Sequence, residues 1–380
     1  MDAVAETPAE PKAGIPPALR GLLVLALLYG FLVGVKLLSS GIKGLGSGFT
    51  DNLFEGASNP LVGLFAGILA TVLVQSSSVS TTTIVGLVAA GTIPVETAIP
   101  MIMGANIGTT ITNTLVSLTQ ARRSEDFKRA FTTATMHDFF NLMAVAILLP
   151  IELFTRVLSR AATWLAGQFA GAEGGSFKSP IKGAVTWGTG HVKDVIHTVT
   201  EDPTGSAALL LVLGLAMIFL TLSLITKNMR TLVAARIERS LNAALERSAL
   251  VGITVGVLIT VAVQSSSITT SILIPLVASG VLLVRSAYPI TLGANVGTTI
   301  TALLAAMAEG ATSALTIALV HAIFNIAAIL IVYPWARTRF IPVLLAEKLA
   351  VVAAERKWLA IAYTFGTFVV LPVVGILLLS

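Results

Sequence analysis

Two identical polar tetrads are the residues best suited to do chemistry in this chain. Gln75-Ser76-Ser77-Ser78 occurs a second time as Gln264-Ser265-Ser266-Ser267, and each copy stands between apolar segments. Their amides and hydroxyls can donate hydrogen bonds to an oxyanion and offer oxygen atoms to a hard cation. In hydrocarbon, such side chains are tolerated only where they line a cavity or lie against other protein. We therefore expect the two tetrads to face each other across one site.

A simpler explanation of the serines is that they serve helix packing. Hydroxyls can bond to carbonyl groups of their own helix, and small side chains let helices approach closely. That explanation suits a single serine better than two identical tetrads.

The composition indicates a helical membrane protein whose solvent is the lipid bilayer. The chain has 380 residues, of which 55% are hydrophobic and 11% charged, and its mean hydropathy is +0.90. Because the apolar segments are long, helices rather than short alternating strands are expected. The absence of cysteine excludes disulfides and thiolate metal sites. The net charge of +5 is attributed to basic loops that orient the helices, so no nucleic-acid partner is predicted.

The segments beside each tetrad are too short to cross a bilayer. Crossing takes roughly 20 residues, whereas the flanking apolar segments cover 59–74 and 79–93 in the first copy and 249–263 and 268–284 in the second. A pair of half-helices forming a re-entrant hairpin, with the tetrad at its tip, accounts for these lengths.

An internal repeat relates the two halves of the chain. Gln264 follows Gln75 by 189 positions, Asn295 follows Asn106 by the same interval, and just over half of the positions aligned between Thr71 and Thr112 are identical. The loop 121–130 carries four basic residues, whereas its counterpart 307–312 carries none. Basic loops stay in the cytoplasm, so equivalent loops are expected on opposite sides of the membrane. The sequence thus predicts an all-α polytopic membrane protein with two inverted-topology repeats.

This interpretation divides the chain into five parts and places most of the 24 basic residues inside the cell. We expect a multi-pass protein of the cell inner membrane with a cytoplasmic N-terminus. Residues 229–248 alternate charged and apolar positions at helical spacing, which is typical of an interfacial amphipathic helix. The parts are a cytoplasmic N-terminal tail (1–18), a first inverted repeat (19–150), an external connecting segment (151–205), a second inverted repeat (206–335), and an amphipathic connection with a C-terminal helix (336–380).

A second repeated motif follows each tetrad. Gly-Ala-Asn-Ile-Gly-Thr-Thr at 104–110 recurs as Gly-Ala-Asn-Val-Gly-Thr-Thr at 293–299. On a helix its asparagine and threonines form one polar stripe, and its glycines let another backbone approach. Packing alone could explain the stripes, but they lie close enough to the hairpins to face the serines. The resulting secondary candidates for the site are Asn106, Thr109, Asn295 and Thr298.

Broken helices with hydroxyl and amide side chains suit small ions of both signs. The N-terminus of a half-helix attracts an oxyanion, whereas the carbonyl groups at a half-helix C-terminus, with Gln and Ser oxygens, suit sodium. Opposite charges stabilise each other at low dielectric, which favours symport. Asp138 breaks the repeat symmetry, because its counterpart is Ala322, and it is equally compatible with an ion site and with a structural pair.

Other function classes remain at this point. A passive anion channel or a proton-coupled transporter of another small oxyanion would use the same polar residues. An intramembrane hydrolase built from a tetrad serine with His137 or His321 is disfavoured, because such chemistry needs one nucleophile, one base and an oxyanion hole.

The motifs resemble those of the type II sodium-coupled phosphate cotransporters. The resemblance rests on the paired tetrads, on the motif at 104–110, on the segments 127–131 and 136–141, and on Tyr333-Pro334 with Arg337. It implies a transporter rather than an enzyme, uptake of inorganic phosphate driven by sodium as the coupling ion, and no organic cofactor. The short, cysteine-free form is typical of a bacterial member. Carried over by motif, substrate and sodium are expected at Gln75, Ser76, Ser77, Ser78, Gln264, Ser265, Ser266 and Ser267, with sodium itself at Gln75, Ser76, Ser77, Gln264, Ser265 and Ser266.

Overall fold

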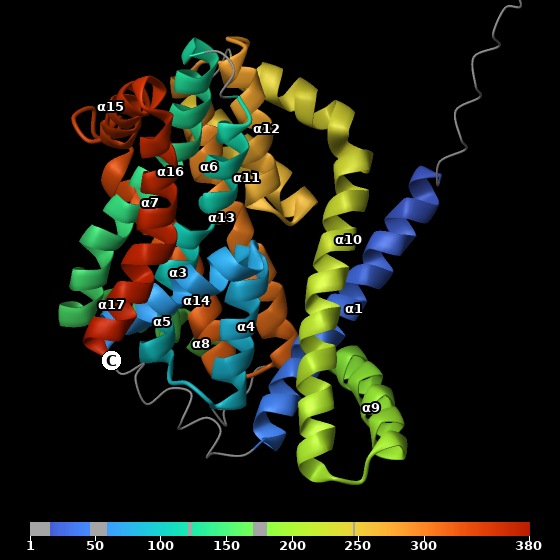
Figure 1. The fold of residues 1–380 in the computed structure, drawn as a ribbon. Coiled ribbons are helices and arrows are strands. Elements are labelled where there is room, and N and C mark those ends of the chain that lie inside the picture. The colour runs from blue at the N-terminus through green and yellow to red at the C-terminus, as the bar shows by residue number, and fades with distance from the viewer. Residues whose placement is uncertain (1–15, 46–58, 121–123, 170–180, 246–247) are drawn as a thin grey trace, which may run out of the picture.

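The fold is helical throughout, as Figure 1 shows for the computed structural model. The structure describes residues 16–45, 59–120, 124–169, 181–245 and 248–380, and for 230–245 the backbone alone. This confirms the predicted all-α class. Among the described residues, six helices are long and apolar enough to cross a membrane: α1 (Pro17–Gly44), α7 (Ser124–Thr155), the first part of α10 (Pro203–Leu245), α13 (Val284–Glu309), α14 (Thr312–Val332) and the helix Lys357–Leu379.

The remaining helices are shorter. The helix Lys357–Leu379 itself consists of α16 (Lys357–Phe365), one π-helical stretch η2 (Gly366–Val370) and α17 (Leu371–Leu379). The short helices are α3 (Pro60–Val74), α4 (Ser77–Ala90), α5 (Val95–Gly108), α6 (Ile111–Leu118), α8 (Val157–Phe169), α9 (Lys182–Val199), α11 (Ala249–Val263), α12 (Ser266–Ala278) and α15 (Ile341–Glu355).

Each tetrad breaks a helix in the same way. Gln75 and Gln264 have φ angles of 55° and 57°, the left-handed conformation that ends α3 and α11. The next residue, Ser76 or Ser265, is extended, and its hydroxyl accepts a hydrogen bond from the backbone N–H three residues later. Serine is a favoured N-cap because its side-chain oxygen accepts a hydrogen bond from a backbone N–H of the first turn, which has no partner within the helix. Glutamine therefore ends one half-helix and serine begins the next.

The two half-helix pairs enter the molecule from opposite ends. In Figure 1, α4 runs from the middle of the molecule to its lower end, whereas α12 runs from the middle to the upper end. The start of α1, the start of α7, the end of α10 and α15 also lie at the upper end, and α9 lies at the lower end. The segments that the sequence predicts to be cytoplasmic thus gather at one end.

Glycines join each first half-helix to the helix that follows its hairpin. A Cβ at Gly104 of α5 would overlap the Leu64 carbonyl of α3, and a Cβ at Gly293 of α13 would overlap the Ile253 carbonyl of α11. Backbone therefore packs on backbone in both copies, which is possible only with glycine. This confirms that the glycines of the second motif allow a close approach.

A buried ion pair connects α1 to the end of α13. The Lys36 ammonium lies 2.8 Å from the Glu309 carboxylate, whose side chain is 1% exposed. Removing Lys36 would leave the buried Glu309 carboxylate unpaired, which is costly in a low-dielectric environment. The pair thus binds the first long helix to the second half of the chain.

Three segments differ from the simplest expectation. The apolar segment after the first hairpin is divided into α5 and α6, although its counterpart α13 is continuous. Both copies contain the same Thr-Thr pair at this point, but Asn113 and Thr114 follow it in the first copy where α13 has Ala302 and Leu303, which favour a continuous helix. Most of the described part of 151–205 is helical, in α8 and α9. Residues 229–245 continue α10, and the side chains that would test their amphipathic character lie outside the described residues.

The glycine contact gives a stability prediction. Gly104→Ala should lower the free energy of unfolding by about 2 kcal/mol, because the new methyl group overlaps the α3 backbone. A matched control is Gly63→Ala on α3, where the nearest atoms to a Cβ are 3.5–3.6 Å away and the change should be neutral or stabilising. Thermal unfolding of the purified protein in detergent measures both. Equal melting temperatures for the two variants would contradict the close approach.

Candidate functional site

The two tetrads meet around one cavity in the middle of the molecule. The Ser78 hydroxyl donates to the Gln264 carbonyl oxygen at 3.5 Å, so the tips are in direct contact. The cavity measures about 350 Å³, and none of the described residues that line it is charged. It is lined by Val74, Gln75, Ser76, Ser78, Val79, Thr112, Phe219, Leu222, Ser223, Thr226, Gln264, Ser265, Ser267 and Ile268.

Six of the eight tetrad residues line this cavity, and two do not. Ser77 and Ser266 are the first residues of α4 and α12, and they are buried at 6% and 2% exposure. The helix geometry explains the difference, because successive side chains of a first turn point in different directions. The structure thus brings together the residues predicted from the repeat, with the middle serines turned into the protein.

The two glutamines are held by equivalent hydrogen bonds. The Gln75 amide nitrogen donates to the Val72 carbonyl at 2.7 Å, and its amide oxygen accepts from the Thr112 hydroxyl at 3.2 Å. Gln264 bonds in the same way to the Val261 carbonyl at 2.7 Å and to the Thr301 hydroxyl at 2.9 Å. Each amide therefore ties its own half-helix to the polar stripe that follows.

These threonines were missed by the sequence reasoning, although a signal was present. Thr112 and Thr301 are separated by 189 positions, the interval that relates the glutamines themselves. Four residues of α10 were missed as well, namely Phe219, Leu222, Ser223 and Thr226. Two hydroxyl residues three positions apart in an apolar helix were the available indication.

The secondary candidates lie beside the site rather than in its lining. Thr109 and Thr298 donate to carbonyls of their own helices, at 2.9 and 3.1 Å. Asn106 and Asn295 are connected through Asn141 of α7, which donates to the Asn106 carbonyl at 2.8 Å and accepts from the Asn295 amide at 2.7 Å. These side chains thus join α5, α7 and α13 behind the cavity, and a role for them in binding stays a prediction.

His137 belongs to the same network. Its Nε2 lies 2.6 Å from the Asn295 Oδ1, and the ring is fully buried. Neither His137 nor His321 lines the cavity with the tetrad serines. The geometry thus offers no serine–histidine pair for a hydrolase at this site.

Asp138 follows His137 in the sequence, but its hydrogen bonds are made to other residues. Its Oδ2 accepts hydrogen bonds from the Tyr363 hydroxyl at 3.2 Å and from the Thr114 hydroxyl at 3.4 Å. The residue is fully buried, and its Oδ1 has no partner among the described residues. Asp138 therefore forms no ion pair with His137 or with a described loop arginine, and it joins α7 to α6 and α16.

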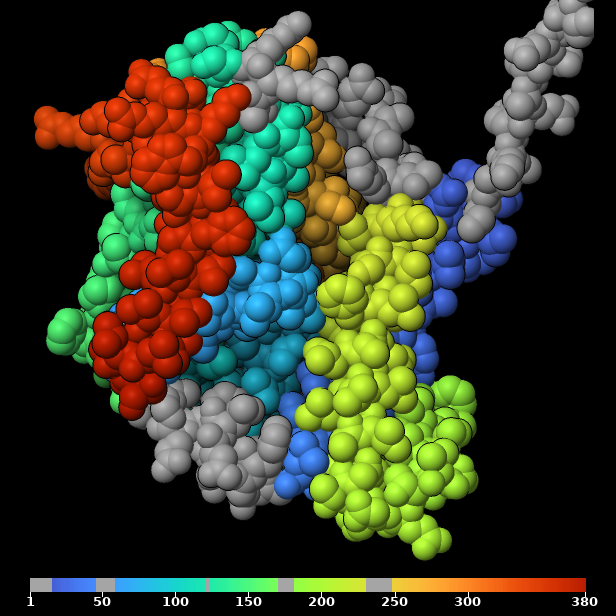
Figure 2. All heavy atoms as spheres, viewed as in Figure 1, coloured from blue at the N-terminus to red at the C-terminus, as the bar shows by residue number. Residues whose placement is uncertain are grey.

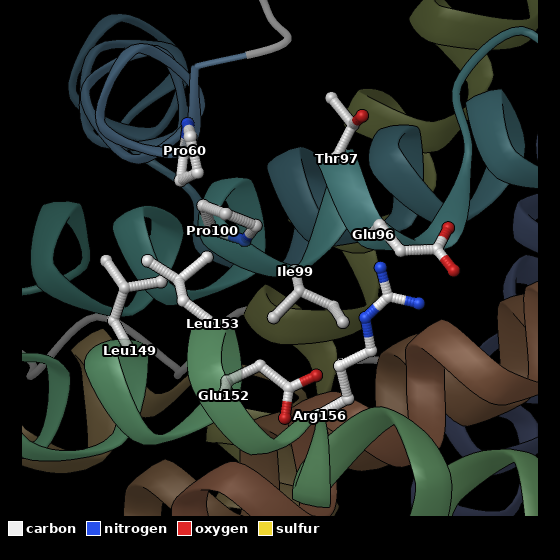
Figure 3. Close-up of a pocket in the computed structure, with 9 residues that line it drawn as sticks. All are labelled: Pro60, Glu96, Thr97, Ile99, Pro100, Leu149, Glu152, Leu153 and Arg156. Atoms are coloured by element: carbon white, nitrogen blue, oxygen red, sulfur yellow. The ribbon is translucent and has the colours of Figure 1, made fainter.

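A second cavity lies between α3, α5 and α7, away from the tetrads. It measures about 170 Å³ and includes Glu96, Glu152 and Arg156 in its lining. Figure 3 shows the Arg156 guanidinium pointing toward the Glu96 carboxylate. Glu152 accepts hydrogen bonds from the Leu158 and Ser159 backbone and so caps α8. Arg285 follows Glu96 by the repeat interval of 189 positions, and its guanidinium stacks over Phe340 at 4.9 Å. Neither of these two charged residues lines the central cavity.

Comparison with known proteins identifies relatives over most of the chain. The family described as Na+/Pi-cotransporter matches residues 31–169 and 217–344. Sodium-dependent phosphate transport protein 2A of Mus musculus is 35% identical, covering 92% of this chain and 66% of the relative, and that of Ovis aries is 34% identical, covering 95% and 68%. Protein 2B of Homo sapiens is 33% identical, covering 93% and 64%. The chain spans about two thirds of the length of these relatives. No solved structure matches.

The helices and the family match define a multi-pass membrane transport protein rather than an enzyme. The chain belongs to the Na+/Pi-cotransporter family. This confirms the family that the paired tetrads indicate.

The asparagine network gives a second prediction, in which the repeat supplies the control. Asn141→Leu should lower the free energy of unfolding by about 1–2 kcal/mol, because Asn295 and the Asn106 carbonyl lose partners across three helices. Asn325 occupies the corresponding position of the second repeat, and among the described residues its side chain donates only to the His321 carbonyl of its own helix, so Asn325→Leu should cost less. Melting temperatures in detergent compare the two. A larger loss for Asn325→Leu would contradict the network's role.

Proposed function

We propose that the protein couples uptake of inorganic phosphate to that of sodium across the cell inner membrane. The observation that carries the proposal is the meeting of the two tetrads around an uncharged cavity of about 350 Å³. The named relatives are sodium-dependent phosphate transport proteins, and the tetrads are the residues that the sequence associates with that family.

The electrostatics of the cavity favour binding of an anion together with a cation. Without a charged side chain in the lining, a phosphate ion would be held by hydroxyls, amides and the N-terminal ends of α4 and α12. These neutral groups and partial helix charges offset only part of the negative charge of a buried phosphate ion. A sodium ion beside it, at the carbonyl ends of α3 and α11, would offset the remaining cost of burial.

Transport would follow from alternating access between two inverted repeats. The half-helix pairs α3–α4 and α11–α12 point toward each other from opposite ends (Figure 1), which supports re-entrant hairpins related by inverted topology. The described basic residues of the α7 start, the α13 start and α15 lie at the same end as the start of α1. Under the positive-inside rule, this end would be cytoplasmic and the N-terminus would lie inside.

Uptake into liposomes tests the proposed function. The purified protein should accumulate labelled phosphate above equilibrium with an inward sodium gradient, and not with potassium or with protons alone. Accumulation driven by protons would indicate the proton-coupled alternative, and equilibration without any gradient would indicate a passive channel. Either result, or no movement of phosphate, would overturn the proposal.

A variant in the tetrad tests the site. Ser267→Ala removes a hydroxyl from the cavity lining, and it should raise the KM for phosphate about tenfold, the effect of losing one hydrogen bond to a charged group. The control is Ser279→Ala at the exposed end of α12, where the hydroxyl bonds the Leu276 carbonyl of its own helix. Uptake kinetics in liposomes measure both. An unchanged KM for Ser267→Ala with unchanged sodium dependence would remove the tetrad from the site.

A further inference from the structure

One wall of the tetrad cavity comes from neither hairpin. Four residues of α10 line this wall. The second, third and fourth lie three, four and seven positions after the first, so they share one face of the helix: Phe219, Leu222, Ser223 and Thr226. The face begins apolar and ends with two hydroxyls. Figure 2 shows α10 next to the α3–α4 pair.

The hydroxyl of Thr226 is hydrogen-bonded to the C-terminal end of α11. Its hydroxyl donates to the Val263 carbonyl oxygen at 3.3 Å. Val263 is the last residue of α11, where carbonyls have no partner within the helix and carry the negative end of the dipole. A hydroxyl whose proton is engaged can offer only oxygen lone pairs to a ligand. Thr226 thus suits a cation and cannot donate to an oxyanion.

Ser223 lies one helical turn before Thr226 on the same face. It lines the same cavity, its side chain is exposed, and no hydrogen bond of its hydroxyl is found among the described residues. The nearby Gln264 carbonyl belongs to the same end of α11 and contacts Ser78 across the cavity. Two hydroxyl oxygens and helix-end carbonyls therefore converge on one side of the site.

We propose that Ser223 and Thr226 of α10 are sodium ligands, which complete a cation site with the carbonyl end of α11. This inference rests on the proposed function, because it assigns the coupling ion within that cavity. A hard cation prefers neutral and anionic oxygen ligands, and the proposed site supplies neutral oxygens next to a negative helix end. The Ser267 hydroxyl, for which no hydrogen bond is found among the described residues, remains for the oxyanion.

The site is asymmetric although the tetrads are symmetric. No residue of α1 is among the described residues that line the cavity. At the equivalent end of α3, the residues that line the cavity besides the tetrad are Val74, Val79 and Thr112, so a single hydroxyl stands there where α10 supplies two at the end of α11. The α10 hydroxyls therefore place this cation on the side of the second tetrad.

Sodium binding can be measured without transport. A ligand that binds the folded protein raises its melting temperature by an amount that grows with the logarithm of the ratio of its concentration to the Kd. In detergent, titration with sodium chloride against choline chloride at constant ionic strength should stabilise the protein. Ser223→Ala and Thr226→Val should each raise the sodium concentration needed for a given increase in melting temperature about tenfold, and Thr226→Ser should restore it.

The matched control is Thr221→Val on the same helix. The Thr221 hydroxyl donates to the Met217 carbonyl of its own helix at 2.6 Å and lies outside the cavity lining. This variant should titrate like the unmodified protein. If Ser223→Ala and Thr226→Val also leave the sodium titration unchanged, α10 supplies no ligand and the inference is wrong.

Uptake separates this inference from the proposed function. If the function holds, both α10 variants should raise the KM for sodium about tenfold while the KM for phosphate at saturating sodium stays within about twofold. A rise confined to the KM for phosphate would overturn the sodium assignment. Absence of sodium-driven phosphate uptake in the unmodified protein would overturn the proposed function, while the sodium titration would still decide the ligand assignment.

Discussion

The lack of water in hydrocarbon is the constraint on which this structure depends. An interrupted helix exposes backbone donors and acceptors that a bilayer cannot satisfy. Here both interruptions line one cavity, and side chains take over part of the pairing. The Gln75 and Gln264 amides bond the carbonyls of Val72 and Val261, and Ser76 and Ser265 cap the following helices. The polar groups that remain unpaired face a shared cavity, so the cost of breaking two helices and the capacity to bind ions have one origin.

Much of the fold class and of the central cavity could be predicted from the sequence. The helical class follows from length and composition, the meeting of the tetrads follows from the interval of 189 residues between them, and the family follows from the resemblance of the motifs. The α10 wall could not be predicted, because Ser223 and Thr226 have no repeated partner and their nearness to Gln264 depends on tertiary packing. The first polar stripe is divided between α5 and α6, whereas α13 continues through the same motif, where alanine and leucine rather than asparagine and threonine follow it.

The glycines and the asparagines of the second motif have different structural roles. The glycines bring α5 onto α3 and α13 onto α11 at backbone distance, while the asparagines connect both following helices to α7. Each first half-helix is therefore fixed to a long neighbour. The asymmetric residues, Asp138 on α7 and the Lys36–Glu309 pair between α1 and α13, lie outside this repeated framework. A pseudo-symmetric scaffold thus carries charged groups that are not symmetric.

The left-handed glutamines have a mechanical consequence. Glycine would occupy a φ of 55° freely and would make each corner a hinge. A residue with a side chain resists this conformation by about 1–2 kcal/mol, and here the amide is anchored at both its nitrogen and its oxygen. Each corner is therefore held by hydrogen bonds at both ends of its amide, where a glycine would leave it free to turn. On this account the distance between the two corners, rather than refolding of either one, would set the size of the ions that fit.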